Sequence, residues 1–252
     1  MHDYVISSKY KRFDAAFLKN LAIISMLVDH TALALLYNSY IKLNLPLTRG
    51  SFQHHLYTLY KILRGFGRLA FPIFCFFLVE GFIYTHSRIQ YLIRLVLFGI
   101  VSEPVFDLAL RGSFPYPKHE NVMFEMALGL LMLWVFESVE RLPLHPDELR
   151  LALQFAAVVP FIVAAQKLHL DYGFKGLLLI LLLYALRSQR LLQCIGGAIF
   201  ISLWEWPAVF SFAALALYNG QRGKQAKYFF YIFYPGHLLL LTLISQYLTK
   251  AG

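Results

Sequence analysis

The amino-acid sequence predicts an all-α, polytopic integral membrane protein with about nine transmembrane helices around a polar intramembrane cavity. Of its 252 residues, 59% are hydrophobic and only 15% are charged, whereas soluble domains are about 45–50% apolar and about 25% charged. The apolar residues form runs long enough to cross about 30 Å of hydrocarbon as helices, which rise about 1.5 Å per residue. Because the connections between runs are short, we expect one domain over residues 1–252.

The first expected span, residues 17–37, carries Lys19, Asp29 and His30 inside an apolar run. An aspartate at the centre of a spanning helix costs about 2.5–3.5 kcal/mol on insertion scales. Lys19 and His30 fall on nearly one face, which we expect to point into a helix bundle. Asp29 and His30 lie about 100° apart around the helix, so each should contact a different neighbour. The alternative is a polar contact that only fixes helix packing.

The remaining spans are expected in order along the chain. A mixed, polar stretch over residues 38–65 is expected to be a loop, and a second span with Arg68 and Glu80 follows it. The other spans are expected at about 91–110, from 121, at about 149–165, from 171, at about 191–204, at about 207–218 and from 228.

The charge pattern limits the classes of partner. The net charge of +9 is spread through the expected loops, as suits contact with anionic lipid headgroups. Nucleic-acid binding would need a basic patch interleaved with exposed aromatic residues, so we expect none. Cytoplasmic loops carry an excess of Lys and Arg, and their modest bias here places the N-terminus in the cytoplasm. Cys75 and Cys194 both lie in apolar runs, and we expect neither a disulfide framework nor a metal site.

Many ionisable residues fall within the expected spans, and so many cannot all face lipid. They should line a shared polar interior, which is either an active site or a transport path. The set is Lys19, Asp29, His30, Arg68, Glu80, Arg94, Glu103, Glu125, Asp171, Lys175, Glu205 and His237.

Four stretches carry a family resemblance: LKNLAIISMLVDH, GRLAFPIFCFFLVEGF, NVMFEMALGLL and FYIFYPGHLLLL. In this order they resemble the TraX family of integral membrane proteins over nearly the whole chain. The resemblance implies a membrane acetyltransferase, because the founding member of that family acetylates the N-terminus of a conjugative pilin. TraX-like proteins are similar to a wider group of membrane acyltransferases whose first-span motif supplies an essential histidine. That motif falls here on Leu18, Lys19, Leu21, Ala22 and His30, with Lys19 in place of an arginine.

The residue types suit acyl transfer from a thioester. Histidine acts as a general base near neutral pH, and His30 is the preferred base. His237, which follows a Pro-Gly break in the last span, is the alternative base, and a carboxylate mechanism is a third possibility. Arg68 is a candidate to stabilise negative charge on the thioester oxygen. Asp29 and Glu80 complete the expected catalytic set.

Acetyl-CoA, the expected cosubstrate, carries phosphates, so its docking loop should be basic and cytoplasmic. Residues 219–224 fit, because their two glycines allow close backbone approach and their basic side chains can meet phosphate. The alternative is an ordinary positively charged inner loop. The expected donor-binding residues are Lys19, Asn219, Arg222, Lys224 and Lys227.

We therefore expect a multi-pass enzyme of the bacterial inner membrane that transfers acetyl from acetyl-CoA to an amine, such as that of a membrane-inserted peptide. Two openings are expected, a basic inner one near Arg222 and a second near Glu80 and residues 38–65. The alternative is one inner vestibule that serves both substrates. The alternatives are an O-acetyltransferase for a sugar or lipid headgroup and a proton-coupled transporter.

Overall fold

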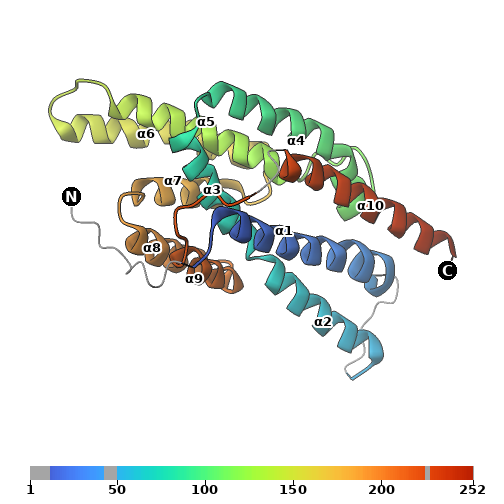
Figure 1. Cartoon of the computed structure of the whole chain (residues 1–252). Coiled ribbons are helices and arrows are strands. Elements are labelled where there is room, and N and C mark those ends of the chain that lie inside the picture. Colours follow the sequence, from blue (N-terminus) through green and yellow to red (C-terminus); the bar gives the residue numbers. More distant parts are fainter. Residues whose placement is uncertain (1–11, 43–49, 225–227, 252) are drawn as a thin grey trace.

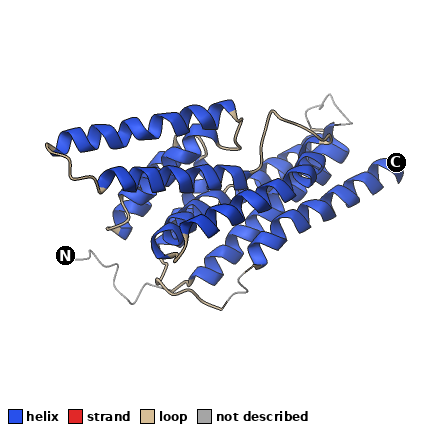
Figure 2. Cartoon of the chain, turned by 90° about the horizontal axis from the view of Figure 1, so that it is seen from above, coloured by secondary structure: helices blue, strands red, loops and turns tan. Residues whose placement is uncertain are grey.

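A computed structural model gives the fold of residues 12–42, 50–224 and 228–251 (Figure 1). Every regular element in these ranges is a helix, as Figure 2 shows by colour, so the all-α prediction is confirmed. The elements are α1 (Ala15–Thr31), the π-helix η2 (Ala32–Ile41), α2 (Phe52–Gly67), α3 (Ala70–Tyr84), α4 (Arg88–Arg111), α5 (Val122–Glu140), α6 (Asp147–Lys167), α7 (Gly173–Ala185), α8 (Arg190–Ser202), the 3-10 turn η4 (Trp206–Val209), α9 (Phe210–Ala216) and α10 (Phe229–Ala251).

Five helical stretches of the described chain are long and apolar enough to cross a membrane, which confirms a membrane protein. They are Ala15–Ile41, Phe52–Tyr84, Val122–Glu140, Asp147–Lys167 and Phe229–Leu248. Helices α7 and α8 have 13 residues each and rise only about 20 Å, less than the hydrocarbon thickness. The number nine therefore stays a prediction.

The structure corrects the prediction of a loop over residues 38–65. Helix η2 continues α1 to Ile41, and α2 fills the second half of the expected loop. Ser51 begins α2, because its Oγ accepts a hydrogen bond from the His54 N–H at 3.2 Å, a typical N-cap contact. The prediction failed because the charged and histidine residues of α2 lower its hydropathy, although its leucines recur at helical spacing.

Helix α3 lies at the centre of the structure and is buried along most of its length. It packs against α1, α5, α7 and α9, and Figure 1 shows it among them. Its sequence is apolar on all sides except at Glu80, a pattern typical of a helix enclosed by others.

Helices α1 and α10 run in the same direction. Lys19 Nζ lies 5.6 Å from the centre of the Phe230 ring near the start of both helices. The Oγ atoms of Ser39 and Ser245 lie 2.8 Å apart near the end of both. The start of α1 and the end of α10 therefore lie at opposite ends of the helix pair.

This arrangement predicts that the two termini face opposite sides of the membrane. Tags at the N-terminus and the C-terminus, probed by protease in sealed vesicles of known orientation, should differ in accessibility. If both tags were cleaved from the same side, α1 and α10 could not each cross the bilayer once in the same direction.

Candidate functional site

The centre of the site is a pair of histidines on two helices. His30 of α1 and His237 of α10 approach to 2.8 Å between Nδ1 of His30 and Nε2 of His237, and their rings are nearly parallel. His30 lies about 22 Å along α1 from Ala15, about halfway along the 27-residue span Ala15–Ile41. The two residues that the sequence offered as alternative bases thus form one hydrogen-bonded unit.

The backbone of α10 assigns the protons within this pair. His237 Nδ1 lies 2.9 Å from the carbonyl oxygen of Phe233, and a carbonyl can only accept a hydrogen bond. His237 Nδ1 therefore carries a proton, and in a neutral imidazole its Nε2 must be the acceptor. His30 Nδ1 then donates to His237, which leaves the basic lone pair on His30 Nε2.

Asp29 faces the opposite neighbour, helix α2. Arg64 Nη1 donates a hydrogen bond to Asp29 Oδ2, and Gly67 packs directly on Asp29. A Cβ at Gly67 would lie 2.3 Å from the Asp29 Cβ, so only glycine allows this close approach. Asp29 Oδ1 is buried with no hydrogen-bond partner in the described chain. The prediction that Asp29 and His30 contact different neighbours is confirmed.

Arg68, at the end of α2, is held beside this cluster by two side chains from distant parts of the chain. Its Nε lies 3.4 Å from Glu205 Oε1, and the Tyr172 side chain lies close enough to interact with its charge. The Tyr172 ring stacks on Phe71 at 3.5 Å. Arg68 and Arg64 both lie close enough to His30 to act on its charge.

Glu80 is not brought to the histidine pair. It lies about 15 Å along α3 from Ala70, and its Oε1 is 3.3 Å from Nη2 of Arg190. Lys19 Nζ lies 4.9 Å from the centre of the Phe77 ring, so this end of α3 lies beside the start of α1. Glu80 and residues 38–65 were expected to flank one opening, but Glu80 lies toward the start of α1, whereas residues 38–41 continue beyond its end and Arg64 lies beside Asp29. That part of the expectation is corrected.

The basic loop over residues 219–224 packs on the start of α1. The Ala15 N–H donates to the Gln221 carbonyl at 2.8 Å, and the Asn219 N–H donates to the Phe13 carbonyl at 2.8 Å. Asn219 Oδ1 accepts from the Gln221 N–H, so this side chain shapes the loop itself. Gly223 has a φ of 68° and lies against Asp14, where a Cβ would come within 2.6 Å of the carboxylate.

This packing gathers positive charge at one end of α1. Arg222 lies close enough to Lys19 for the two charges to repel each other, and Lys224 follows in the same loop. Of the expected donor-binding residues, Lys227 lies outside the described residues. The other four belong to this end of the molecule.

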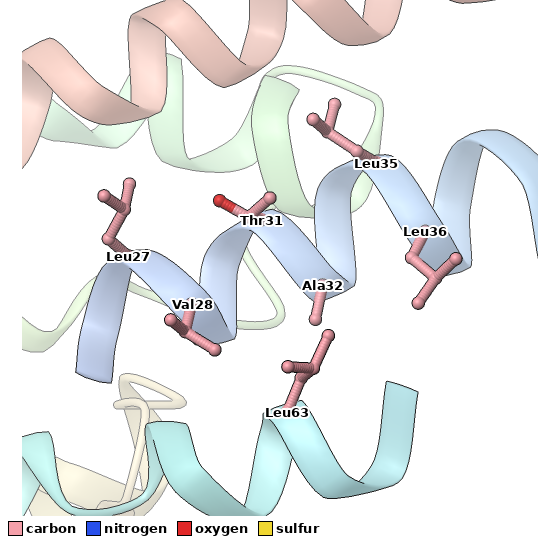
Figure 3. A pocket seen from close by; sticks show the side chains of 7 residues that line it. All are labelled: Leu27, Val28, Thr31, Ala32, Leu35, Leu36 and Leu63. Carbon is pink, nitrogen blue, oxygen red and sulfur yellow. The ribbon is translucent and has the colours of Figure 1, made fainter. Parts of the chain in front are cut away.

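Two grooves flank α1. The first, of about 530 Å³, separates α1 and η2 from α2, and Figure 3 shows Leu63 pointing from α2 toward Ala32. The second, of about 700 Å³, separates α1 from α10 and includes His237 in its lining. Both are lined mainly by apolar side chains. A ligand that reaches the histidine pair along α1 would therefore pass apolar side chains before it meets the polar imidazoles.

No group of three or more His, Cys, Asp or Glu side chains that could hold a metal ion occurs in the part of the chain that the structure describes. Sequence reasoning missed Arg64, because it was assigned to a loop. Tyr172 was also missed as a site residue, because it fell at the start of the span expected from 171. The helical spacing of the leucines in α2 was the signal that could have placed Arg64 on a helix.

Comparison with known proteins gives two matches. The family model described as TraX protein matches residues 14–245. A protein of Dichelobacter nodosus described as "Probable fimbrial assembly protein FimC, serogroup H1" is 32% identical over 265 residues, which cover 94% of this chain and 97% of that protein. No solved structure matches the chain. The family match covers most of the sequence, including both histidines of the pair, and the chain belongs to the TraX family.

Proposed function

We propose that this protein is a membrane-embedded acetyltransferase that moves an acetyl group from acetyl-CoA to the amine of a pilin-related acceptor. The observation that carries the proposal is the His30–His237 pair, which leaves one basic nitrogen halfway along a membrane-spanning helix. Membership of the TraX family and the fimbrial assembly relative support a pilin-related acceptor.

In the proposed reaction, His30 Nε2 takes a proton from the acceptor amine as its nitrogen attacks the thioester carbonyl carbon. The carbon–sulfur bond then breaks, and the departing sulfur takes the proton from His30. While His30 is protonated, His237 Nε2 accepts the hydrogen bond from its Nδ1 and holds the ring in place. Arg68 supplies positive charge for the oxygen that becomes negative in the transition state.

Acetyl-CoA would approach from the basic end of α1. Three positive charges gather at the loop that follows α9. Two belong to the loop itself, Arg222 and Lys224, and the third is Lys19 of α1. Phosphate groups form strong charge-assisted hydrogen bonds with such side chains. In a cytoplasmic-N-terminus orientation this end would face the compartment that contains acetyl-CoA.

The double substitution Arg222→Ala and Lys224→Ala should raise the KM for acetyl-CoA by about tenfold with little change in kcat, because it removes uniform binding. An acyl donor without the nucleotide phosphates should react with the double variant as it does with the wild type. Lys167→Ala, which removes a lysine at the end of α6, is the matched control. Equal effects on both donors would show that the loop only orients the protein in the membrane.

The experiment that tests the function uses purified protein, labelled acetyl-CoA and two synthetic peptides, one with a free and one with a blocked N-terminus. Mass spectrometry should detect one added acetyl group on the free peptide alone. Acetylation of the blocked peptide at hydroxyl groups would favour O-acetyl transfer. If no acceptor, including sugars and lipids, gained an acetyl group, the proposal would be wrong and transport would become the leading function.

A further inference from the structure

The groove between α1 and α10 follows one continuous face of α10. Phe229, Ile232, Phe233, Gly236, His237 and Leu240 line it at spacings of three and four residues, which place them in one stripe along the helix. Leu27 closes it from α1. From Phe229 to His237 the stripe rises about 12 Å, and Leu240 extends it to about 16 Å.

The two ends of this groove differ in chemistry. Near one end, and outside the lining itself, Lys19 lies 5.6 Å from the ring of Phe230, the neighbour of Phe229, and within the field of Arg222. At the other end, His237 is hydrogen-bonded to His30. Between the ends, the described residues of the lining carry no charged side chain. A complementary ligand has an anionic head, a narrow uncharged arm about as long as the groove and a reactive group at the tip.

Gly236 is the position where this groove is open. Apart from the chain neighbours and the nearby backbone of α10, no heavy atom of the described residues lies within 4 Å of the place that a Cβ would occupy at Gly236. Glycine is among the weakest helix formers, and the packing around this residue does not require it. A side chain at residue 236 would project into the groove beside His237 without displacing the protein around it.

We propose that the α1–α10 groove binds the pantetheine arm of the acyl-CoA donor and that Gly236 keeps the groove open beside the histidine pair. This inference rests on the proposed acetyl transfer and assigns the path by which the thioester reaches His30. The charge complementarity of the basic end with the CoA phosphates selects this occupant. A phospholipid, the rival occupant, also has an anionic headgroup, but it offers no reactive group to the histidine pair at the other end of the groove.

The test compares Gly236→Trp, which fills the groove, with Gly236→Ala, which adds one methyl group. Binding of CoA and of adenosine 3′,5′-bisphosphate, which has no pantetheine arm, is measured on purified protein in detergent. Gly236→Trp should weaken CoA binding by about tenfold or more and leave the nucleotide unchanged, while Gly236→Ala should change both by less than about twofold. Ile232→Trp, at a different point of the groove, should repeat the tryptophan pattern.

Unchanged nucleotide binding shows that each variant is folded, so the readout does not depend on activity. If Gly236→Trp bound CoA as tightly as the wild type, the groove would face lipid only and the inference would be wrong. Equal weakening of both ligands would also overturn it, because the effect would then act on the nucleotide end. If the wild type bound no CoA at all, the proposed function would fail together with this inference.

Discussion

His30→Gln is expected to abolish acetyl transfer, whereas His237→Gln should retain a measurable rate. Glutamine at residue 30 removes His30 Nε2, the nitrogen of the histidine pair whose lone pair is free to take a proton. A general base raises the rate of such reactions by about 10²–10⁴-fold. In the unsubstituted protein, His30 Nδ1 and His237 Nε2 lie 2.8 Å apart. The side-chain oxygen of a glutamine at residue 237 can still accept the hydrogen bond from His30 Nδ1. We expect it to cost about tenfold, because His30 keeps its tautomer and its orientation. Initial rates of peptide acetylation measure both variants.

His237→Leu is the matched comparison for His237→Gln. Leucine fills a similar space but cannot accept a hydrogen bond, so His30 would lose the partner that fixes its proton at Nδ1. Its rate should fall below that of His237→Gln by about tenfold or more. Binding of adenosine 3′,5′-bisphosphate, which has no pantetheine arm to enter the groove beside His237, serves as the control for folding in all three variants. Equal rates for the two glutamine variants, or a faster His30→Gln, would contradict the assignment of the base.

The sequence predicted the elements of this site better than their arrangement. Periodicity and the 100° offset between adjacent helix positions were enough to separate the neighbours of Asp29 and His30, because these depend on one helix alone. The contact between His30 and His237 joins residues 207 positions apart. Such a contact depends on how α1 and α10 pack, which local patterns do not encode.

Errors arose where polar residues were taken as signs of a loop or of a shared cavity. Helix α2 was assigned to a loop because hydropathy averages over its charged and apolar faces, and this hid the ion pair of Arg64 with Asp29. Glu80 was grouped with His30 as one of the ionisable residues within the spans. The structure instead pairs Glu80 with Arg190 of α8, so a half-buried charge can find a partner at some distance from the candidate active site.

Arg64→Leu is expected to destabilise the protein strongly. The Asp29 side chain is only 11% exposed, and its Oδ1 already lacks a hydrogen-bond partner among the described residues. Removing Arg64 leaves this carboxylate buried without its ion-pair partner, which costs about 3–5 kcal/mol for buried pairs. Thermal unfolding of the purified protein in detergent measures the loss. Lys61→Leu, which removes an exposed cation one turn earlier in α2, should change the unfolding temperature little.

The double variant Arg64→Leu with Asp29→Asn separates the charge from the shape of the site. Because it removes both charges, most of the lost stability should return, as replacing a whole buried ion pair is often nearly neutral. If the pair serves only packing, acetyl transfer should return with stability. If the ion pair also orients His30 through α1, stability should return but the rate of acetyl transfer should stay low. The two substituted side chains would then no longer hold α1 and α2 in register beside Gly67. Arg64→Leu with the stability of the wild type would show that the ion pair does not hold α2 against α1.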